Sequence, residues 1–328
     1  MARFFFVRIR AMKAVVITRP GGPEVLHLQD VPEPQPKPGE IVVRVEAGGV
    51  NFADILSARG NYPGTPKPPF TAGREFAGVV EQTGKRVMGY TQWGAFAERV
   101  AISEAYLWPQ PEGWGSEQSA AFPVNYFTAY FAYWKAGLLE AHELPPTVLI
   151  HAVAGGVGTA AVEIGHVLGV EMFGTSSSDE KLASVQALGL QHPINYARED
   201  YVDAVMKATN HTGVDAVFEM LGGEHTMRSV RCLKFLGRII QYGSATGKPA
   251  TVDARELFAR QTSVHGLWLS PLSGHAEIMR SAWQKLSEWI GEGKLRPQIG
   301  HVLKMSQAEE GYRLLSDRKN YGKVVLKW

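Results

Sequence analysis

Short apolar runs alternate with stretches of helical spacing over the second half of the chain. The clearest run starts at Thr147, is rich in β-branched residues, breaks on glycines and resumes with helical spacing near Thr159. This pattern predicts a strand, a tight turn and a helix. Similar patterns predict further strands at 170–175, 192–196, 213–221, 237–243 and 263–269, and helices at 180–188 and about 223–235. Apolar strands that alternate with helices predict an α/β fold with a doubly wound parallel sheet.

The first third of the chain has a different pattern. From Met12 to Pro123, short strands such as 40–46 and 78–81 are separated by proline and glycine, which predicts an irregular β-rich domain. Helical spacing follows at 116–137, and the chain closes with helices at 275–291 and 306–316 and a strand at 322–327. We expect these last elements to return to the β-rich domain.

The expected domain organisation is therefore an insertion. A dinucleotide-binding domain of residues 128–269 interrupts a catalytic domain made of residues 12–127 and 270–328. Residues 1–11 precede a second methionine and contain arginine but no acidic residue. A targeting segment has this charge pattern, but the stretch is short and lacks serine. We interpret it as an irregular N-terminal extension outside the fold.

The glycine turn after the first strand of the predicted sheet indicates a phosphate site. In the spacing Ala152-x-x-Gly155-x-x-Gly158, the two glycines let the backbone approach a pyrophosphate closely. The N-terminus of the following helix stabilises such an anion through its free N–H groups and its dipole. Ala152 departs from G-x-G-x-x-G, and short motifs recur by chance. The repeated strand–helix units around the turn make a dinucleotide the leading ligand.

Composition narrows the possible functions. With 328 residues and 45% apolar content the chain is long enough for two domains. A net charge of +2, without a basic cluster interleaved with aromatic residues, does not favour nucleic acid or a membrane surface as a partner. The uncharged stretch 144–162 approaches the length of a membrane span, but its prolines and glycines favour a strand and a turn.

The chain has a single cysteine, Cys232. One cysteine excludes an intramolecular disulfide and a zinc site made of several thiolates. Cys232 falls in the helix predicted at about 223–235, where an inert buried thiol is the favoured interpretation. A reducing compartment fits this usage, and we expect a cytoplasmic protein.

Several motifs together are much more specific than the glycine turn alone. They lie at 49–54 (GVNFAD), 60–63 (GNYP), 72–78 (AGREFAG), 151–158 (HAVAGGVG), 194–196 (INY) and 321–326 (YGKVVL). With them, the chain from about 12 to 326 resembles the zinc-free quinone oxidoreductases, also called the zeta-crystallin family, of the medium-chain dehydrogenase/reductase superfamily. The resemblance implies a Rossmann domain inserted in a GroES-like catalytic domain, NADPH as the cofactor, and a homodimer formed through the nucleotide-domain sheets.

Metal-assisted chemistry is not expected. The zinc alcohol dehydrogenases of the superfamily carry a cysteine and a histidine at positions that resemble Asn51 and Arg74, and neither replacement is a good zinc ligand. Their structural zinc lobe needs four cysteines, which the corresponding stretch here lacks. The ten histidines show no H-E-x-x-H or similar spacing. The sequence therefore predicts a zinc-independent enzyme.

The segment after the second strand favours NADPH over NADH. An acidic residue there would bond the ribose of NAD and repel a phosphate, but 174–178 is neutral. Ser177 and Lys181 can contact an anion, and the resemblance adds Tyr196 to the 2′-phosphate contacts. A structural alternative is a capping box formed by Ser177 and Glu180. Asp179 and Glu180 would oppose the phosphate if they turned toward it.

The resemblance also implies the other cofactor contacts. Thr128 is expected near the nicotinamide and Arg318 near the phosphates, although they could be a core residue and a surface charge respectively. The remaining expected cofactor-binding positions are Asn51, Ala154, Gly155, Gly156, Val157, Gly158, Ser176, Tyr242, Gly243 and Trp268.

The expected reaction is hydride transfer to a small-molecule acceptor, a quinone or an α,β-unsaturated carbonyl. Without zinc, hydrogen-bond donors must stabilise the developing oxyanion. Asn51 is the candidate for positioning substrate or nicotinamide, or else a turn-forming asparagine. Tyr62 is a candidate proton donor by its resemblance to the tyrosine of zinc-free enoyl thioester reductases, or else a loop tyrosine that packs on proline. Asp54 and Glu75 are expected to have structural hydrogen bonds.

Two rival functions stay open at this point. An enoyl thioester reductase with Tyr62 as its proton donor is the nearest enzymatic alternative. A non-catalytic NADPH-binding structural or sensor protein is the alternative from another class, because the fold does not decide function.

Overall fold

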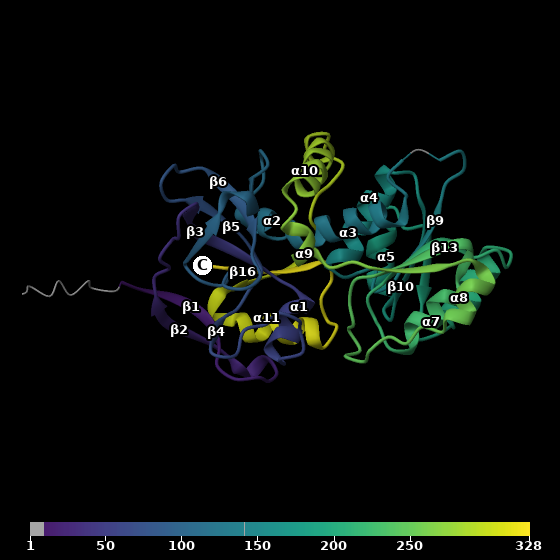
Figure 1. Ribbon diagram of the computed structural model, residues 1–328, viewed down its shortest axis with the longest axis horizontal. Helices are drawn as coiled ribbons and strands as arrows, with labels where there is room; N and C mark the ends of the chain where they lie inside the picture. Colours follow the sequence, from purple (N-terminus) through teal and green to yellow (C-terminus); the bar gives the residue numbers. More distant parts are fainter. Residues whose placement is uncertain (1–9, 141) are drawn as a thin grey trace, which may run out of the picture. The chain divides into compact units, whose positions relative to one another are not determined.

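The computed structural model describes residues 10–140 and 142–328, in two compact units (Figure 1). One unit contains the chain up to Pro123 with residues 301–319 and 324–328. The second unit contains residues 124–300 and 320–323. Residues 270–300, which the sequence pattern assigned to the catalytic domain, are part of the second unit. The predicted extension 1–11 lies largely outside the described residues, and β1 already begins at Ala11.

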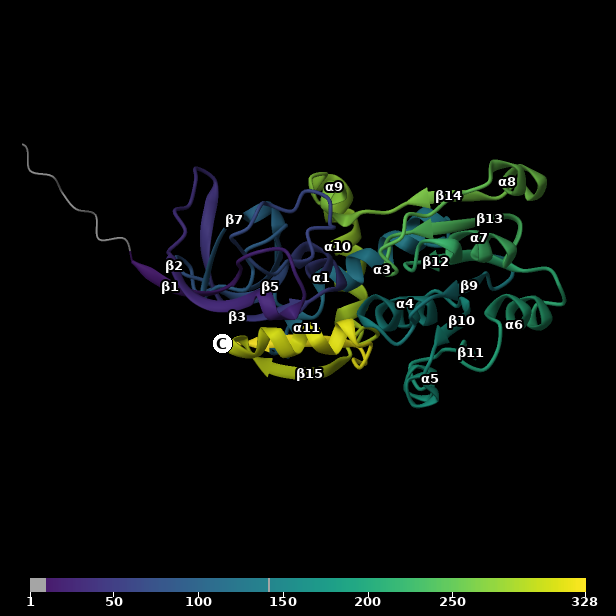
Figure 2. The same ribbon diagram turned by 90° about the horizontal axis from the view of Figure 1, so that it is seen from below.

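The second unit is built on a six-stranded parallel sheet. Its strands are β9 (Thr147–Ile150), β10 (Glu171–Ser176), β11 (His192–Asn195), β12 (Val214–Glu219), β13 (Leu233–Gln241) and β14 (Ser263–Gly266). They follow one another in the order β11-β10-β9-β12-β13-β14 (Figure 2). The strand order therefore reverses between β9 and β12, where ligands bind in doubly wound sheets. This confirms the predicted fold class.

The helices of this unit agree with the sequence pattern in part. They are α3 (Pro123–Ala136), α4 (Gly156–Val167), α5 (Asp179–Gln186), α6 (Tyr201–Ala208), α7 (Glu224–Arg231), α8 (Ala254–Arg260), α9 (Leu269–Ser273) and α10 (Ala276–Gly291). The helical stretch expected at 116–137 is broken into α2 (Ser116–Ala120) and α3, because Pro123 lacks an N–H and starts a new helix. Helices α6, α8 and α9 were not predicted.

The first unit contains two antiparallel sheets. β1 (Ala11–Ile17) lies between β2 (Leu26–Pro32) and β4 (Phe70–Thr71). The larger sheet has the order β15-β16-β3-β5-β6-β8, with β7 also paired to β3. Its strands are β3 (Glu40–Val50), β5 (Glu75–Val80), β6 (Arg86–Tyr90), β7 (Arg99–Ser103), β8 (Leu107–Pro109), β15 (Ile299–Lys304) and β16 (Lys323–Lys327).

Two helices of this unit lie close together although they are far apart in the chain. α1 (Phe52–Ala58) follows β3, and α11 (Ala308–Ser316) comes from the C-terminal segment. The core between the elements contains Phe76, Phe96 and Tyr312, each at most 1% exposed.

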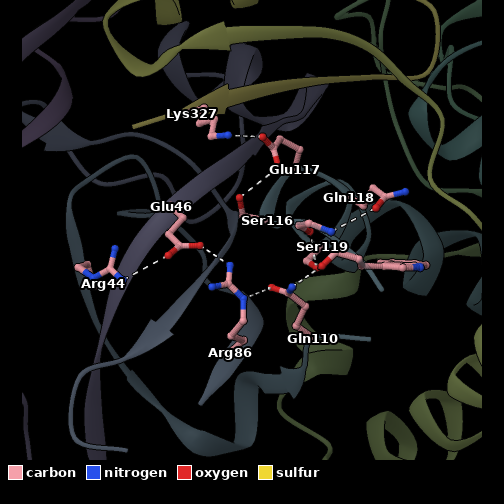
Figure 3. A network of polar contacts seen from close by, with 11 residues as sticks. Arg44, Glu46, Arg86, Gln110, Ser116, Glu117, Gln118, Ser119 and Lys327 are labelled. Atoms are coloured by element: carbon pink, nitrogen blue, oxygen red, sulfur yellow. Dashed lines mark hydrogen bonds and ion pairs between the residues drawn. The ribbon is translucent and has the colours of Figure 1, made fainter. Parts of the chain in front are cut away.

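A polar network on the surface of the first unit connects β3, β6, α2 and β16 (Figure 3). The Glu46 carboxylate accepts from Arg86 at 2.5 Å and from Arg44 at 3.3 Å. Lys327 donates to Glu117 at 2.5 Å and so ties the last strand to α2. The three cations are about half exposed to solvent, so water screens these pairs and each contributes little to stability.

A buried carboxylate fixes the segment 296–298 in the second unit. Glu163 on α4 is 7% exposed and accepts from the Tyr126 hydroxyl at 2.7 Å, the Arg296 N–H at 3.0 Å and the Gln298 amide at 2.8 Å. Burial raises the pKa of Glu163, whereas these three hydrogen bonds oppose the rise. The carboxylate links α3, α4 and the segment after α10.

We expect Glu163→Ala to lower the free energy of unfolding by about 2–4 kcal/mol, because it leaves buried donors without their acceptor. Urea denaturation followed by circular dichroism measures the change. Glu199→Ala, at an exposed position of the same unit, is the control and should change stability by less than about 0.5 kcal/mol. Equal effects of the two substitutions would contradict the role of Glu163.

Candidate cofactor and active site

The turn between β9 and α4 is tightly constrained by its neighbours. The helix begins at Gly156, earlier than the predicted start near Thr159, and Gly155 is its N-cap residue. A Cβ at Gly158 would lie 2.4 Å from the Val153 carbonyl oxygen, and a Cβ at Gly156 would lie 2.5 Å from the Asn125 amide nitrogen. A side chain at Gly158 would require backbone movement, and one at Gly156 would displace the Asn125 side chain. The first turn of α4 presents N–H groups without intrahelical partners, as an anion site requires.

The segment 320–323 runs along this turn. Gly322 forms a parallel bridge with Gly155 and donates its N–H to the Ala154 carbonyl at 2.8 Å. Next to it, the ammonium group of Lys323, 2% exposed, donates to Asn125 at 3.4 Å. The sequence interpretation did not assign Asn125 and Lys323 to the site. The motif at 321–326 was the available signal, since its glycine and lysine meet the turn here.

A buried polar network lies directly before the glycine turn. His151 follows β9 and is 1% exposed. Its Nδ1 lies 3.0 Å from the Thr175 hydroxyl on β10, and its Nε2 lies 3.0 Å from the Ser229 hydroxyl on α7. Ser229 in turn donates to Glu219 at the end of β12, at 2.7 Å. Glu219 also accepts the N–H groups of Leu221 and Gly222. The network therefore connects the ends of three central strands.

The donors and acceptors of this network determine the state of His151. Ser229 uses its only proton on the Glu219 carboxylate, so it accepts from His151, whose Nε2 must carry a proton. Burial lowers the pKa of His151, with the nearby Glu219 carboxylate opposing and His225 and Arg228 adding to the effect. The imidazole is therefore neutral, and Nδ1 accepts from Thr175. In this arrangement both ring nitrogens of His151 have hydrogen-bond partners.

The predicted 2′-phosphate residues come together at the ends of β10 and β11. Tyr196 donates its N–H to the Ser176 carbonyl at 3.1 Å, which places it beside the segment 176–178. The capping residue of α5 is Ser178, which accepts from the Lys181 N–H at 3.3 Å. The predicted capping box of Ser177 and Glu180 is therefore wrong. Ser177 lies exposed just before the cap.

Asp179, the first residue of α5, has partners of its own. Asp179 accepts from the Asn195 amide at 2.6 Å and forms an ion pair with Arg198. Partial burial lowers the pKa of Lys181, and the neighbouring Glu180 opposes the shift. Arg198 is a further cation that the sequence interpretation missed, although it lies two residues after Tyr196.

The remaining predicted cofactor residues have varied surroundings. Tyr242 donates its N–H to the Glu219 carbonyl, and burial raises the pKa of its phenol. Trp268 is the N-cap residue of α9 and is 41% exposed, whereas Thr128 is buried within α3. Arg318, in the first unit, follows α11 with a positive φ of 57°. Cys232 is buried, and burial raises the pKa of its thiol to about 12, in agreement with an inert cysteine.

In the first unit, Asn51 and its neighbours form a rigid corner. The Asn51 amide, 6% exposed, donates to Glu75 at 2.8 Å and to the Gly49 carbonyl at 3.2 Å. Its backbone N–H donates to the Asp54 carboxylate at 2.8 Å, at the start of α1. Glu75 and Asp54 thus hold Asn51 in place from two sides.

Arg74 is the charged centre of the same corner. It is 5% exposed, and its Nε lies 3.3 Å from the Asp54 carboxylate. Its Nη2 donates to the Ser57 hydroxyl at 2.6 Å, and its guanidinium carbon lies 4.3 Å from the centroid of the Tyr62 ring. Arg74, Asp54 and Ser57 line a pocket of this unit together with Trp93 and Tyr312.

The residue types at this corner do not form a metal site. Within residues 10–140 and 142–328, no group of three or more His, Cys, Asp or Glu side chains could hold a metal ion. The described part of the chain also has no helix long and apolar enough to cross a membrane.

Comparisons with known proteins agree with this geometry. Residues 37–112 match the family model described as "Alcohol dehydrogenase GroES-like domain", and residues 188–326 match the one described as "Zinc-binding dehydrogenase". Quinone oxidoreductase-like protein 2 of Bos taurus is 32% identical to the chain, over 92% of this chain and 88% of its own length. The chain belongs to the zinc-free quinone oxidoreductases of the medium-chain dehydrogenase/reductase superfamily. The predicted family is thus confirmed.

The proteins that are similar to this quinone oxidoreductase family member carry different names. The quinone oxidoreductase of Thermus thermophilus, also solved in complex with NADPH, is 38% identical, with a TM-score of 0.85 over 97% of this chain and 100% of its own. The CurK enoyl reductase has a TM-score of 0.84 at 26% identity, over 96% and 99% of the two chains. The synaptic vesicle membrane protein VAT-1 homolog of Homo sapiens is 33% identical, over 96% of this chain and 86% of its own.

The neutral state of buried His151 gives this oxidoreductase a pH dependence. The unfolded chain binds a proton at His151 near pH 6.5, whereas the folded chain resists it, so the unfolded state binds more protons as the pH falls below about 6.5. The contribution of His151 to the free energy of unfolding is therefore complete above this pH. It decreases on acidification, by at most about 1.4 kcal/mol per pH unit.

Denaturant titrations between pH 7.5 and 5 measure this effect. His151→Asn is expected to be less stable than wild type at pH 7.5, and the difference should shrink toward pH 5. His27→Asn, at an exposed histidine, is the control. A difference between wild type and His151→Asn that stays constant with pH would show that His151 does not titrate as proposed.

Proposed function

We propose that this protein is an NADPH-dependent, zinc-independent reductase of quinones or α,β-unsaturated carbonyls. The observation that carries the proposal is the combination, in one unit, of the glycine turn at the N-terminus of α4 with an uncharged Ser176–Ser177 pair at the end of β10 and Lys181 in the first turn of α5. The Thermus thermophilus relative, crystallised with NADPH, supports the same cofactor.

The residues present fit NADPH. The first turn of α4 can bind the pyrophosphate, because Gly155, Gly156 and Gly158 leave the backbone N–H groups accessible. Lys181 and Ser177 would hold the 2′-phosphate, with Tyr196 beside them. Asp179, one of the two acidic residues that could oppose a phosphate, forms an ion pair with Arg198. When bound, the nicotinamide supplies a hydride.

The first unit would supply the groups that handle the acceptor. The amide of Asn51 is fixed by Glu75 and Gly49, so it can hold a substrate or nicotinamide group in one orientation. Tyr62 carries a hydroxyl that can donate a proton, and Arg74 provides a positive charge without a metal ion. A second candidate, an enoyl thioester reductase, is favoured by this tyrosine–arginine contact and by the likeness to the CurK enoyl reductase.

A turnover assay tests the proposed function. Oxidation of NADPH and NADH is followed with 1,4-benzoquinone, a simple enone and a short enoyl thioester, each with and without a chelator. The proposal expects turnover that resists the chelator and prefers NADPH by about 10-fold or more. NADPH binding without turnover of any acceptor would favour the non-catalytic binding protein. Loss of turnover in chelator would contradict zinc independence.

We expect Lys181→Ala to weaken NADPH binding by about 10-fold, which is roughly 1.4 kcal/mol, because an ammonium group near the 2′-phosphate is lost. Binding of NADH, which lacks this phosphate, should change by less than about 2-fold. Quenching of intrinsic fluorescence measures both affinities. Lys207→Ala, an exposed lysine on α6, serves as the matched control. If NADPH and NADH lose affinity equally in Lys181→Ala, the lysine has no role in cofactor choice.

The assembly and the compartment are part of the same proposal. β14 is an edge strand of the parallel sheet, so a second copy could extend the sheet across a two-fold axis. A homodimer in the cytoplasm is the expected form. Analytical ultracentrifugation of the purified chain tests the first part, and a fluorescent fusion in cells tests the second.

A further inference from the structure

The guanidinium of Arg74 lies in an unusual environment for a cation. It is nearly buried and held on one side by the Asp54 carboxylate and the Ser57 hydroxyl. On another side it lies over the Tyr62 ring, 4.3 Å from the centroid. The Thr65 hydroxyl donates to the Tyr62 carbonyl at 2.7 Å, and its oxygen lies 3.1 Å from the Ser57 hydroxyl. The loop that carries Tyr62 and the guanidinium are therefore tied together by three contacts.

This geometry has a chemical consequence for Tyr62. A cation over an aromatic face is attracted to the electron density of the ring. If the phenol gives up its proton, the ring carries a full negative charge and the attraction to Arg74 becomes stronger, especially in a site shielded from water. Arg74 therefore stabilises the phenolate more than the phenol. This is the property that a residue needs when it assists a neighbouring proton donor.

The surroundings keep the guanidinium in this position. Its Nε lies 3.3 Å from the Asp54 carboxylate without forming a hydrogen bond, and its Nη2 donates to Ser57, while the guanidinium carbon lies over the Tyr62 ring. Asp54 is in turn bonded to the Asn51 N–H at 2.8 Å. A lysine in place of Arg74 would keep the charge but lose the flat face and the simultaneous contacts with Asp54 and Ser57.

We propose that Arg74 is a positioning residue that enables Tyr62 to act as a proton donor and thereby adapts the enzyme to α,β-unsaturated carbonyl substrates. This inference rests on the proposed reductase function and deepens it by choosing between the two classes of acceptor. Arg74 acts through Tyr62.

A hydride forms a C–H bond at the β-carbon, and the electron pair of the C=C bond moves to the α-carbon and the carbonyl oxygen. The O–H bond of Tyr62 breaks as the new C–H bond forms at the α-carbon, which leaves a phenolate under Arg74. The phenolate recovers a proton from water, and NADPH ends as NADP⁺. A quinone instead takes its protons on oxygen, where exchange with water is fast, so it needs no such donor.

Steady-state kinetics with four variants test the proposal. They are Tyr62→Phe, Arg74→Met, Arg74→Lys and the double variant Tyr62→Phe/Arg74→Met. We expect the ratio of kcat/KM for the enone to kcat/KM for the quinone to fall about 100-fold in Tyr62→Phe and about 10-fold in Arg74→Met. The ratio for Arg74→Lys should lie between those for Arg74→Met and wild type. The ratio for the double variant should be no lower than that for Tyr62→Phe, because Arg74 acts only through the tyrosine.

Matched controls come from the same unit. Arg86→Met removes an exposed guanidinium of the surface network in Figure 3, and Tyr106→Phe removes a hydroxyl far from the corner in sequence. Neither should change the enone-to-quinone ratio.

A further readout separates this role from a structural one. In D₂O, wild type should add deuterium to one face of the α-carbon, and Tyr62→Phe should give both stereoisomers in the product. Arg74→Met, in which Tyr62 still donates but less efficiently, should lose this selectivity only in part. Arg74→Lys and Tyr62→Phe keep the kinetic test available if Arg74→Met does not fold.

The failures of the two proposals are distinguishable. If wild type neither binds NADPH nor reduces any acceptor, the proposed function fails. If it reduces both acceptor classes and the enone-to-quinone ratio is the same in all variants, the reductase stands and the role of Arg74 and Tyr62 is refuted. If the double variant lowers the enone-to-quinone ratio by the product of the two single effects, Arg74 does not act through Tyr62.

Discussion

The close contact of backbone segments around the glycine turn is the constraint on which the rest of the second unit depends. Side chains are excluded at Gly156 and Gly158 by Asn125 and by the Val153 carbonyl. Gly322 closes the turn from another side by bonding Ala154. Directly before the turn, both ring nitrogens of His151 are bonded. The turn is therefore preorganised, so an anionic ligand need not supply the free energy for ordering it.

The His151 network extends this constraint to the other loops at the same edge of the sheet. Thr175 precedes the serines of the proposed 2′-phosphate site, and Glu219 holds the N–H groups of the loop after β12. One buried polar chain thus fixes three loops whose relative positions decide whether a dinucleotide fits. Such a chain is stabilising only when each donor and acceptor is satisfied, which explains the single tautomer of His151.

The sequence predicts the parts of the structure whose signals are local. The strands from β9 to β14 have apolar runs, and the glycines, Ser177, Lys181 and Tyr196 lie near the ends of those runs. Helix α6 was missed because it has only eight residues, too few to show a clear helical period. The sequence nevertheless contains its N-cap residue, Asp200. His151 and Ser229 are separated by 78 positions, so no local pattern reveals their contact. Asn125 and the Arg74–Tyr62 contact were missed for the same reason, whereas Lys323 lies in the motif at 321–326, whose contact with the turn was not anticipated. The assigned site residues stay predictions until ligand binding is measured.

The central claim is that the glycine turn and the segment after β10 together select NADPH. Calorimetric titration of the cofactor-free protein with NADPH and, separately, with NADH tests it most directly. The account predicts saturable binding of both, with NADPH tighter by about 10-fold or more, because the 2′-phosphate meets Lys181 and Ser177. Equal affinities, tighter binding of NADH, or no heat with either dinucleotide would contradict it.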